Sequence, residues 1–380
     1  MLGSFGVWTR GTLQARAMPL ARELAASAGL QIAIVTTPWD DPEQAGVVER
    51  VDDVLIVNTL AVRPSSTPLA VAQQLNILRQ LDPSLVHIMK PKAFAGLAGQ
   101  AILRIGSTRT IIVDHDDWEG DGGWNDHAGY SVAARRLFAF QERSLIGSAD
   151  GVTVASTLLE ERARLMRRTR DDDRITLLPN GLERSWMERL ETSRRARQPD
   201  LAPGIVLYSR FAEFSLDWLT EMLWTLDTMV SEPITFQVIG RHQPQSPMFS
   251  DYRWIRPVWH GFVQRQAIPD LLAEATIALY SYDDNLINRS KQSVKLLELM
   301  ASGCAVVASD VGDLRRIGGD AVELVDPGDS GRFAEAVHRL IIDRERTAEI
   351  GRRARQRVRA YTMDHLATRL YEAYVKAGLS

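Results

Sequence analysis

The stretch from Lys295 to Asp329 constrains the fold of this chain more than any other part of the sequence. It begins with a short apolar segment, Lys295 to Ser302, that ends at Gly303, a residue able to adopt the left-handed conformation that closes a helix. The next residues, Cys304 to Ser309, are small or β-branched and show no polar alternation. Such a run is typical of a parallel strand that is buried on both faces. The stretch therefore predicts a helix, a buried strand, a second short helix and another strand.

Glu298 is the one acidic residue of the first predicted helix. A buried carboxylate is costly unless hydrogen-bond donors surround it, and a ribose diol supplies such donors. The turn Asp310-Val311-Gly312 leaves the carboxyl end of the predicted strand, which is the edge where open α/β sheets bind ligands. Glu298 is therefore a candidate for binding a ribose.

The stretch from Lys295 to Asp329 closely resembles the donor-binding segment of the GT-B glycosyltransferases of family 4, which retain anomeric configuration. The resemblance implies that Glu298 binds the ribose of the donor nucleotide. Some branches of the family carry a Ser-x-Lys-x-x-Glu pattern, which Ser293, Lys295 and Glu298 form here. The chain departs from the common family pattern at Ser290, where a second glutamate is expected. How the sugar and the diphosphate are held is therefore left open by the resemblance.

Length and composition agree with a two-domain cytoplasmic enzyme. The 380 residues suffice for two domains with cores of their own, and 45% hydrophobic with 24% charged residues is the balance of a globular enzyme. A formal net charge of -3 provides no positive field for nucleic acid, so no nucleic-acid partner is expected. The single cysteine, Cys304, fits a reducing cytoplasm, and no apolar run reaches the length of a membrane span.

Apolar runs alternate with helical stretches along the chain. In the first half they are Gln31 to Thr36, Leu85 to Met89 and Thr110 to Val113, and a second series begins at Ile205. This alternation predicts an α/β fold with doubly wound parallel sheets. The resemblance implies the GT-B architecture, with two Rossmann-like domains whose parallel sheets face a central cleft. The predicted parts are an N-terminal acceptor domain (1–193), a linker (194–204), a C-terminal donor domain (205–362) and a C-terminal helix that packs back on the N-terminal domain (363–380).

The first strand of the N-terminal domain is short in this sequence. In the resembling family this strand precedes a glycine loop and lies centrally in the sheet. Only Met1 and Leu2 precede the glycine-containing residues here. We therefore expect the natural start to lie a few codons upstream.

His115 is the predicted catalytic residue. It follows the predicted strand from Thr110 to Val113, at the position where many family members carry a histidine that contacts the transferred sugar. The resemblance implies a same-face reaction in which the departing diphosphate helps to deprotonate the acceptor hydroxyl. The imidazole or its backbone carbonyl would then steady positive charge on the anomeric carbon. The alternative is a turn histidine bonded to the neighbouring acids.

The residues Asp114-His115-Asp116 also form an Asp-x-Asp pattern. In the other major glycosyltransferase fold this spacing holds a divalent metal between nucleotide phosphates. Because the C-terminal half resembles the metal-free GT-B fold, we expect neither a metal ligand nor a cofactor. The nucleoside diphosphate sugar is the co-substrate.

Arg210 follows the predicted strand that starts at Ile205, where the family has an arginine that binds the donor diphosphate. Its forked guanidinium suits phosphate oxygens. The family's lysine five positions later is Ser215 here, and Lys291 and Lys295 are candidates to replace that cation beside a helix N-terminus. The predicted donor-binding residues are Gly11, Arg210, Lys291, Ser293, Val294, Lys295 and Glu298.

The predicted acceptor site lies in the loop that follows His115. The sequence WEGDGGWNDHAGY is too long and too aromatic for a simple turn, and sugar faces pack well on aromatic rings. A self-packed surface loop is the alternative. The predicted acceptor-binding residues are Arg10, Asp117, Trp118 and Trp124.

Two basic segments are candidates for contact with anionic lipid. They are Arg135-Arg136 and the run from Arg162 to Arg170. A solvated basic face is the alternative explanation. The predicted localisation is cytoplasmic, with peripheral contact at the inner face of the membrane left open.

The sequence as a whole predicts a retaining, metal-independent glycosyltransferase of the hexosyltransferase type. It would move a sugar from a nucleoside diphosphate donor to a hydroxyl of a glycan, a lipid-linked molecule or a small molecule. A nucleotide-sugar epimerase or a phosphorylase of the same fold is one alternative. A non-catalytic relative that binds sugar nucleotides is the other, because Ser215 and Ser290 stand where the family carries charge. No motif sets the donor sugar, the base, the acceptor or the oligomeric state.

Overall fold

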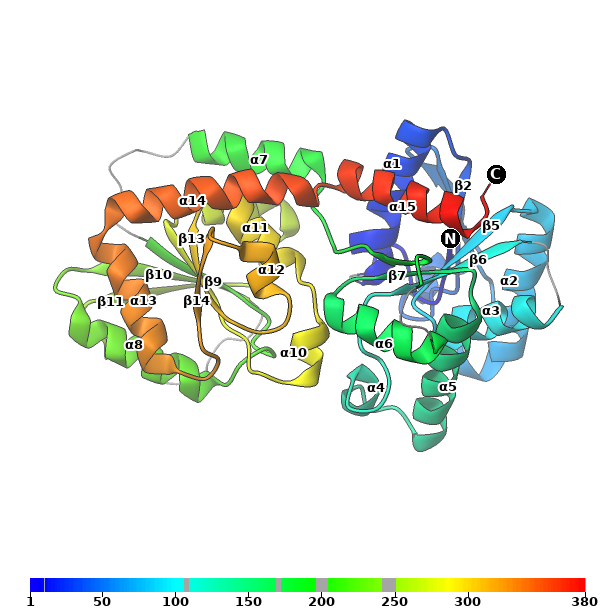
Figure 1. Cartoon of the computed structure of the whole chain (residues 1–380), viewed down its shortest axis with the longest axis horizontal. Helices are drawn as coiled ribbons and strands as arrows, with labels where there is room; N and C mark the ends of the chain where they lie inside the picture. Colours follow the sequence, from blue (N-terminus) through cyan, green and yellow to red (C-terminus); the bar gives the residue numbers. More distant parts are fainter. Residues whose placement is uncertain (10, 106–108, 169–171, 196–203, 241–250, 380) are drawn as a thin grey trace. The chain divides into compact units, whose positions relative to one another are not determined.

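Strands and helices alternate along the chain in the computed structural model, which describes residues 1–9, 11–105, 109–168, 172–195, 204–240 and 251–379 (Figure 1). The chain folds into two units. Unit 1 comprises Met1–Gly181, Ser290–Gln292 and Met363–Ser380, and unit 2 comprises Leu182–Arg289 and Ser293–Thr362. The α/β architecture predicted from the alternating apolar runs is confirmed, because each unit has a central sheet with helices between its strands.

Unit 1 is built around an eight-stranded sheet with the order β3-β4-β2-β1-β5-β6-β7-β8. Its strands are β1 (Leu2–Gly3), β2 (Ile32–Thr36), β3 (Val48–Val51), β4 (Val54–Asn58), β5 (Leu85–Met89), β6 (Thr110–His115), β7 (Gly151–Val154) and β8 (Ile175–Leu177). The pair β3 and β4 is antiparallel, whereas the other pairs are parallel. Asp52 and Asp53, with φ of 46° and 62°, form the hairpin turn between them. The sheet is thus mixed at this edge, since a turn this short permits only antiparallel pairing.

The helices of unit 1 pack on this sheet, except for α4, which contacts α5 (Figure 1). They are α1 (Met18–Ala28), α2 (Thr67–Leu81), α3 (Ala93–Ile105), α4 (Trp124–His127), α5 (Val132–Ser148), α6 (Thr157–Arg167) and α15 (Met363–Ala377). The helix α15 belongs to unit 1 although it follows all of unit 2 in the sequence. Its Leu366 and Leu370 share a buried cluster with Leu20 and Leu24 of α1.

Strand β1 lies in the middle of the sheet and contains two residues. Leu2 pairs with Val35 of β2 and with Ile88 of β5. A cavity of about 700 Å³ lies beside Met1, lined by residues at the amino ends of β2 and β5 and by α15. Burial at this point lowers the pKa of the Met1 α-amino group to about 5. Because the amino ends of the strands line this cavity, it lies at the opposite end of the sheet from His115, the last residue of β6.

Unit 2 contains a six-stranded parallel sheet with the order β11-β10-β9-β12-β13-β14. Its strands are β9 (Gly204–Tyr208), β10 (Ile234–Ile239), β11 (Ile255–Gly261), β12 (Ile277–Tyr280), β13 (Ala305–Ser309) and β14 (Val322–Val325). Val306 and Ala308 of β13 pack in one apolar cluster, and Ala305 and Val307 pack in another. The prediction of a strand buried on both faces is therefore confirmed.

The helices of unit 2 connect these strands. They are α7 (Arg184–Arg195), α8 (Leu216–Met229), α9 (Ile268–Ala273), α10 (Leu286–Ser290), α11 (Val294–Ser302), α12 (Leu314–Gly318), α13 (Ser330–Ile342) and α14 (Arg344–Val358). The helix predicted from Lys295 is confirmed as α11, and Gly303 with φ of 79° ends it. The predicted domain boundary at residue 193 lies within α7, a helix of unit 2. Residues 196–203 of the predicted linker lie outside the described residues.

Candidate functional site

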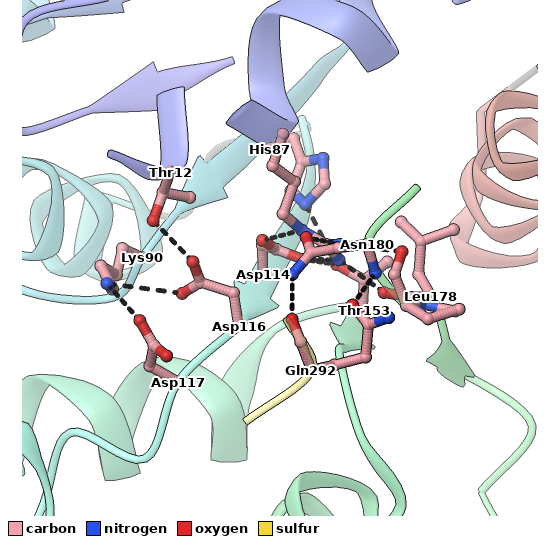
Figure 2. Close-up of polar contacts among 12 residues, drawn as sticks. Thr12, His87, Lys90, Asp114, Asp116, Asp117, Thr153, Leu178, Asn180 and Gln292 are labelled. Atoms are coloured by element: carbon pink, nitrogen blue, oxygen red, sulfur yellow. Dashed lines mark hydrogen bonds and ion pairs between the residues drawn. The ribbon is translucent and has the colours of Figure 1, made fainter. Parts of the chain in front are cut away.

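The carboxyl ends of β5 and β6 form the edge of unit 1 that carries His115 and the predicted acceptor residue Asp117, which Figure 2 shows beside Lys90. His115 is the last residue of β6, and Asp116 and Asp117 follow it. Lys90 follows β5 in the same way. Open α/β sheets bind ligands at this edge, because loops there carry side chains beyond the buried strands.

A buried ion pair between Arg16 and Asp114 ties this edge to the rest of unit 1. Arg16 Nε lies 2.7 Å from Asp114 Oδ2, and Arg16 Nη2 lies 2.8 Å from Asp114 Oδ1. Thr153 Oγ1 donates to Asp114 Oδ1 at 2.5 Å (Figure 2). Arg16 also donates to the carbonyls of Leu178 and Pro179. Burial disfavours the charged carboxylate, but Arg16 outweighs this effect and holds the pKa of Asp114 below its ordinary value.

Asp114 is thus an anchor of the fold. Both of its carboxylate oxygens are engaged, by Arg16 and by Thr153, which leaves Asp116 as the available acid of the Asp-x-Asp pattern. Among the described residues, no group of three or more His, Cys, Asp and Glu side chains is arranged to hold a metal ion.

His115 is fully buried, and its ring is held by an acid of α5. His115 Nε2 lies 3.1 Å from Glu142 Oε1, and Arg162 Nη2 of α6 lies 2.8 Å from Glu142 Oε2. Burial opposes the ionisation of Glu142, but the bonds from His115 and Arg162 outweigh it and lower its pKa to about 2. Glu142, rather than the acids adjacent in sequence, therefore fixes the imidazole. Within the described part of the chain, no group bonds to His115 Nδ1.

Lys90 stands among three acids. Its Nζ lies 2.7 Å from Asp117 Oδ2, 3.2 Å from Glu119 Oε1 and 3.9 Å from Asp116 Oδ1. Thr12 Oγ1 donates to Asp116 Oδ2 at 2.6 Å. Burial, together with the neighbouring carboxylates, outweighs the attraction of Lys90 and raises the pKa of Asp116 to about 6. Burial by itself would lower the pKa of Lys90, but the three carboxylates outweigh burial and raise this pKa well above the ordinary value.

The aromatic loop predicted to bind the acceptor packs on its own neighbours. The guanidinium carbon of Arg162 lies 3.8 Å from the ring centre of Trp118. Trp124 begins α4, and its backbone nitrogen donates to the carbonyl of Trp118 at 2.9 Å. Both tryptophans are half-buried, and Asp117 is bonded to Lys90. The loop is therefore ordered by internal contacts, with part of each tryptophan left accessible.

Of the two predicted residues in the first loop, Arg10 and Gly11, the structure describes Gly11. Arg10 lies outside the described residues. Gly11 is exposed, and a Cβ added there would meet no described atom within 4 Å. The next residue, Thr12, makes the contact with Asp116. Close approach of a ligand to Gly11 therefore stays a prediction.

In unit 2 the predicted donor residues lie after β9 and at the start of α11. Ser293 caps α11, and its hydroxyl accepts a hydrogen bond from the backbone of Lys295 at 3.3 Å. Lys295 Nζ lies 4.9 Å from the ring centre of Tyr208, the last residue of β9. Arg210 is 58% exposed and pairs with Glu213 at 3.2 Å. Two cations are thus carried at this edge of the unit 2 sheet.

Glu298 lies inside α11, with 2% of its side chain exposed. The Nη1 atom of Arg265 is 3.6 Å from its Oε1 atom. Burial raises the pKa of Glu298 to about 7, against the opposing attraction of Arg265 and Lys295. Val294, whose amide is predicted to meet the donor, is the first residue of the same helix.

The two serines that stand in place of family charges have local contacts. Ser215 is the N-cap of α8, and its hydroxyl accepts a hydrogen bond from the backbone of Trp218 at 3.1 Å. The carbonyl of Ser290 accepts a hydrogen bond from Ser156 Oγ at 2.7 Å. The first contact explains a serine at position 215, because serine is a preferred helix cap.

Lys291 belongs to unit 1 together with its neighbours Ser290 and Gln292. Gln292 Oε1 accepts a hydrogen bond from the backbone nitrogen of Asn180 at 2.6 Å, which fixes this short segment in place. Burial opposes the ionisation of Asp117, but Lys90 above all, and Lys291 with it, lower the pKa of Asp117. The structure thus places Lys291 within reach of Asp117, one of the predicted acceptor residues.

The sequence interpretation missed three residues of this edge. They are Arg16, Lys90 and Glu142. Lys90 directly follows the apolar run from Leu85 to Met89, so its position at a strand end was a usable signal. Arg16 and Glu142 lie within helical patterns, and nothing in their local sequence sets them apart from surface residues.

The basic run considered for membrane contact is paired in the structure. Arg162, Arg164 and Arg167 each form an ion pair with an acid of unit 1. Residues 169–171 of this run lie outside the described residues. None of the helices described here is long and apolar enough to cross a membrane.

Comparison with known proteins matches both halves of the chain to families. Residues 11–181 match the family described as "Glycosyl transferase 4-like domain", and residues 202–343 match the family described as "Glycosyl transferases group 1". No curated protein matches the sequence.

Solved structures with a similar fold cover nearly the whole chain. Sucrose-phosphate synthase from Thermosynechococcus elongatus is 20% identical over 98% of this chain and 97% of its own, with a TM-score of 0.70. Anabaena HepE in complex with UDP and glucose is 15% identical over 98% of both chains, with a TM-score of 0.63. A UDP-forming α,α-trehalose-phosphate synthase from Burkholderia xenovorans is 10% identical over 100% of this chain and 99% of its own, with a TM-score of 0.70. These likenesses show a shared fold.

The Arg16–Asp114 pair gives a prediction about stability. Arg16→Met should lower the free energy of unfolding by about 3–5 kcal/mol, because it leaves the Asp114 carboxylate buried without its cation. Asp114→Asn in the same chain should restore part of this loss by removing the orphaned charge. Urea denaturation followed by circular dichroism measures both effects.

The control is Arg22→Met, which removes the half-buried partner of the exposed Asp52 from the same unit. It should cost about 0–1 kcal/mol, since exposed pairs are worth little. Equal losses in Arg16→Met and Arg22→Met would contradict the anchoring role of the buried pair.

Proposed function

Since this chain belongs to the group 1 glycosyltransferases and has the GT-B fold, we propose that it moves a sugar from a nucleoside diphosphate donor to an acceptor hydroxyl with retention of configuration and without a metal. The observation that carries this proposal is Glu298, an acid kept inside the apolar helix α11. A ribose diol would donate to this carboxylate and offset the cost of its burial. HepE in complex with UDP and the UDP-forming trehalose-phosphate synthase make UDP the first nucleotide to test.

The remaining donor contacts are assigned to the same edge of unit 2. Arg210 is exposed at the end of β9 and has a fork suited to diphosphate oxygens. Lys295 adds a second cation, and the amides of Ser293 and Val294 lie at the N-terminus of α11 where the helix dipole favours an anion. Charge neutralisation by these groups would assist departure of the diphosphate without a divalent ion.

His115 is assigned to the reaction centre of unit 1. Its Nε2 is held by the ionised Glu142, which fixes the orientation of the ring. A fixed imidazole dipole costs little reorganisation when positive charge develops on the anomeric carbon. In this mechanism the leaving diphosphate takes the proton of the acceptor hydroxyl, and His115 acts by electrostatic stabilisation.

Peripheral contact with the inner face of a membrane stays a prediction for α5. Arg135 is paired with Asp126 at 3.2 Å, while Arg136 is exposed near the apolar side chains of Val132, Leu137 and Phe140. Such a mixture of exposed apolar and basic residues is typical of helices that lie on anionic lipid.

A donor screen tests the proposed function. Purified protein is titrated with UDP, GDP, ADP and dTDP sugars, with and without EDTA, and binding is measured by thermal shift and turnover by released nucleotide. We expect one donor to raise the unfolding temperature and to be slowly hydrolysed in both conditions. Binding without release of nucleotide would indicate the non-catalytic relative, and no binding of any donor would contradict the proposal. Loss of turnover in EDTA would contradict metal independence alone.

The pKa of Glu298 gives a pH-dependent prediction for donor binding. The carboxyl is protonated below pH about 7 in the unliganded protein, whereas a ribose diol requires the ionised form as acceptor. Affinity for UDP should therefore rise with pH up to about 7, by about tenfold per pH unit at most, and then level off. Glu298→Gln should bind more weakly above pH 7 and lack this rise. The phosphate of UDP also titrates in this range and affects both proteins equally. The readout is therefore the ratio of the UDP dissociation constants of Glu298→Gln and of the unmodified chain, measured by calorimetry at each pH. A ratio independent of pH would remove the ribose assignment.

The assignment of His115 is tested by separating binding from transfer. His115→Ala should leave the affinity for UDP within about twofold and reduce donor turnover by about a hundredfold, since only electrostatic stabilisation of the transition state is lost. The control is His127→Ala, which removes an exposed histidine of α4. Full activity of His115→Ala would move the reaction centre elsewhere.

A further inference from the structure

Asp116 is the residue of the unit 1 edge whose hydrogen bonding is incomplete. It directly follows His115, and its side chain is 9% exposed. Its Oδ2 atom accepts a hydrogen bond from Thr12 at 2.6 Å, whereas its Oδ1 atom is buried and accepts none from the described residues. Buried polar atoms are normally bonded, so an unbonded carboxylate oxygen at a ligand-binding edge marks a place for a donor from outside.

Lys90 does not fill this place. Its Nζ lies 3.9 Å from Asp116 Oδ1, beyond hydrogen-bonding distance, but 2.7 Å from Asp117 Oδ2 (Figure 2). It also lies 3.2 Å from Glu119 Oε1. The ammonium is therefore directed at two other acids and attracts Asp116 only through space.

The backbone holds Lys90 in position at a conformational cost. Lys90 has a φ of 73° and Ala93 a φ of 55°, values that residues with a side chain rarely adopt. Ser4 Oγ donates to the carbonyl of Lys92, and the backbone nitrogen of Ala93 donates to Gln141 Oε1, each at 2.9 Å. Strain that the surroundings maintain in this way is typical of functional sites. The loop after β5 thus presents Lys90 beside Asp116 as a fixed pair.

The pair selects the chemistry of its ligand. A hydroxyl donates to a carboxylate oxygen and accepts from an ammonium, so two neighbouring hydroxyls satisfy both groups. An anionic group would be repelled by the three carboxylates around Lys90, and a cationic group would be repelled by Lys90 itself. Although burial, and after it the neighbouring carboxylates, raises the pKa of Asp116 to about 6, the carboxyl is mostly ionised at pH 7.5 and is then an acceptor.

We propose that Asp116 binds and orients a hydroxyl of the acceptor, that Lys90 bonds a second hydroxyl, and that the acceptor is a neutral sugar or polyol at this point. This inference rests on the proposed glycosyl transfer and specifies its acceptor. Asp116 is next to His115, so a hydroxyl held by its Oδ1 atom lies at the same sheet edge as the assigned reaction centre. The contact adds a specificity-determining residue that the aromatic loop does not provide.

The test compares acceptors of different charge in the full-length chain, with the donor found in the screen. Methyl α-glucoside and maltose are the neutral probes, glucose 6-phosphate is the anionic probe and glucosamine is the cationic probe. The neutral probes should have the lowest KM. Asp116→Asn should raise that KM by about tenfold to a hundredfold, because a charged hydrogen bond is lost, and should leave the affinity for UDP within about twofold.

Two further variants keep the test decisive. Asp121→Asn removes an exposed acid of the same loop and should leave the acceptor KM unchanged. Thr12→Val removes the hydroxyl that holds Asp116 Oδ2 but keeps the carboxylate. It should raise the acceptor KM several-fold, so it answers the question even if Asp116→Asn unfolds.

Three results would overturn the inference. One is an acceptor KM equal to that of the unmodified chain in both Asp116→Asn and Thr12→Val. Another is a preference for glucose 6-phosphate or glucosamine, and in both cases continued donor turnover would leave the proposed function intact. The third is an equal loss of UDP affinity in Asp116→Asn, which would make Asp116 a residue of the fold. If the unmodified chain neither binds nor turns over any donor, the proposed function fails and this inference fails with it.

Discussion

The buried ion pair between Arg16 and Asp114 is the constraint on which the candidate site of unit 1 depends. A guanidinium without water must place its donors on protein acceptors, and here the Asp114 carboxylate and the carbonyls of Leu178 and Pro179 supply them. These acceptors come from β6 and from the segment after β8, so one side chain fixes their relative positions. Such a pair contributes little net stability compared with an apolar core, but it permits few alternative arrangements. The strand end that carries His115 is thereby held rigid.

The two units use charge in different ways. In unit 2 a single acid, Glu298, is kept in an apolar helix, and burial raises its pKa to about 7. Its ionisation then depends on what donates to it, so the proposed ribose contact would couple the charge of Glu298 to nucleotide binding. In unit 1 opposite charges are clustered around Lys90, and these fixed charges would need little rearrangement to bind the proposed acceptor. Donor and acceptor chemistry would thus rest on distinct electrostatic devices.

Local sequence patterns predicted the elements well where one physical effect dominates. The run Cys304 to Ser309 has no polar side chain that faces water between its ends, so only a strand covered on both faces accommodates it, and β13 is such a strand. Gly303 ends α11 because a left-handed cap costs least without a Cβ. The hairpin of β3 and β4 was not predicted from the pattern. Asp52 and Asp53 form its turn with positive φ values, and aspartates in a sequence do not by themselves indicate such a turn.

The sequence by itself determined the alternation of strands and helices, the family, and the candidates His115 and Glu298, because these depend on periodicity and on contiguous motifs. Only the tertiary structure decided which side chains meet at the edge of unit 1. Arg16 and Asp114 are far apart in the chain, and Glu142 reaches His115 from a helix whose pattern is that of any amphipathic surface. Such contacts are set by the packing of whole elements, and the local sequence around one residue does not indicate which distant residue it will contact.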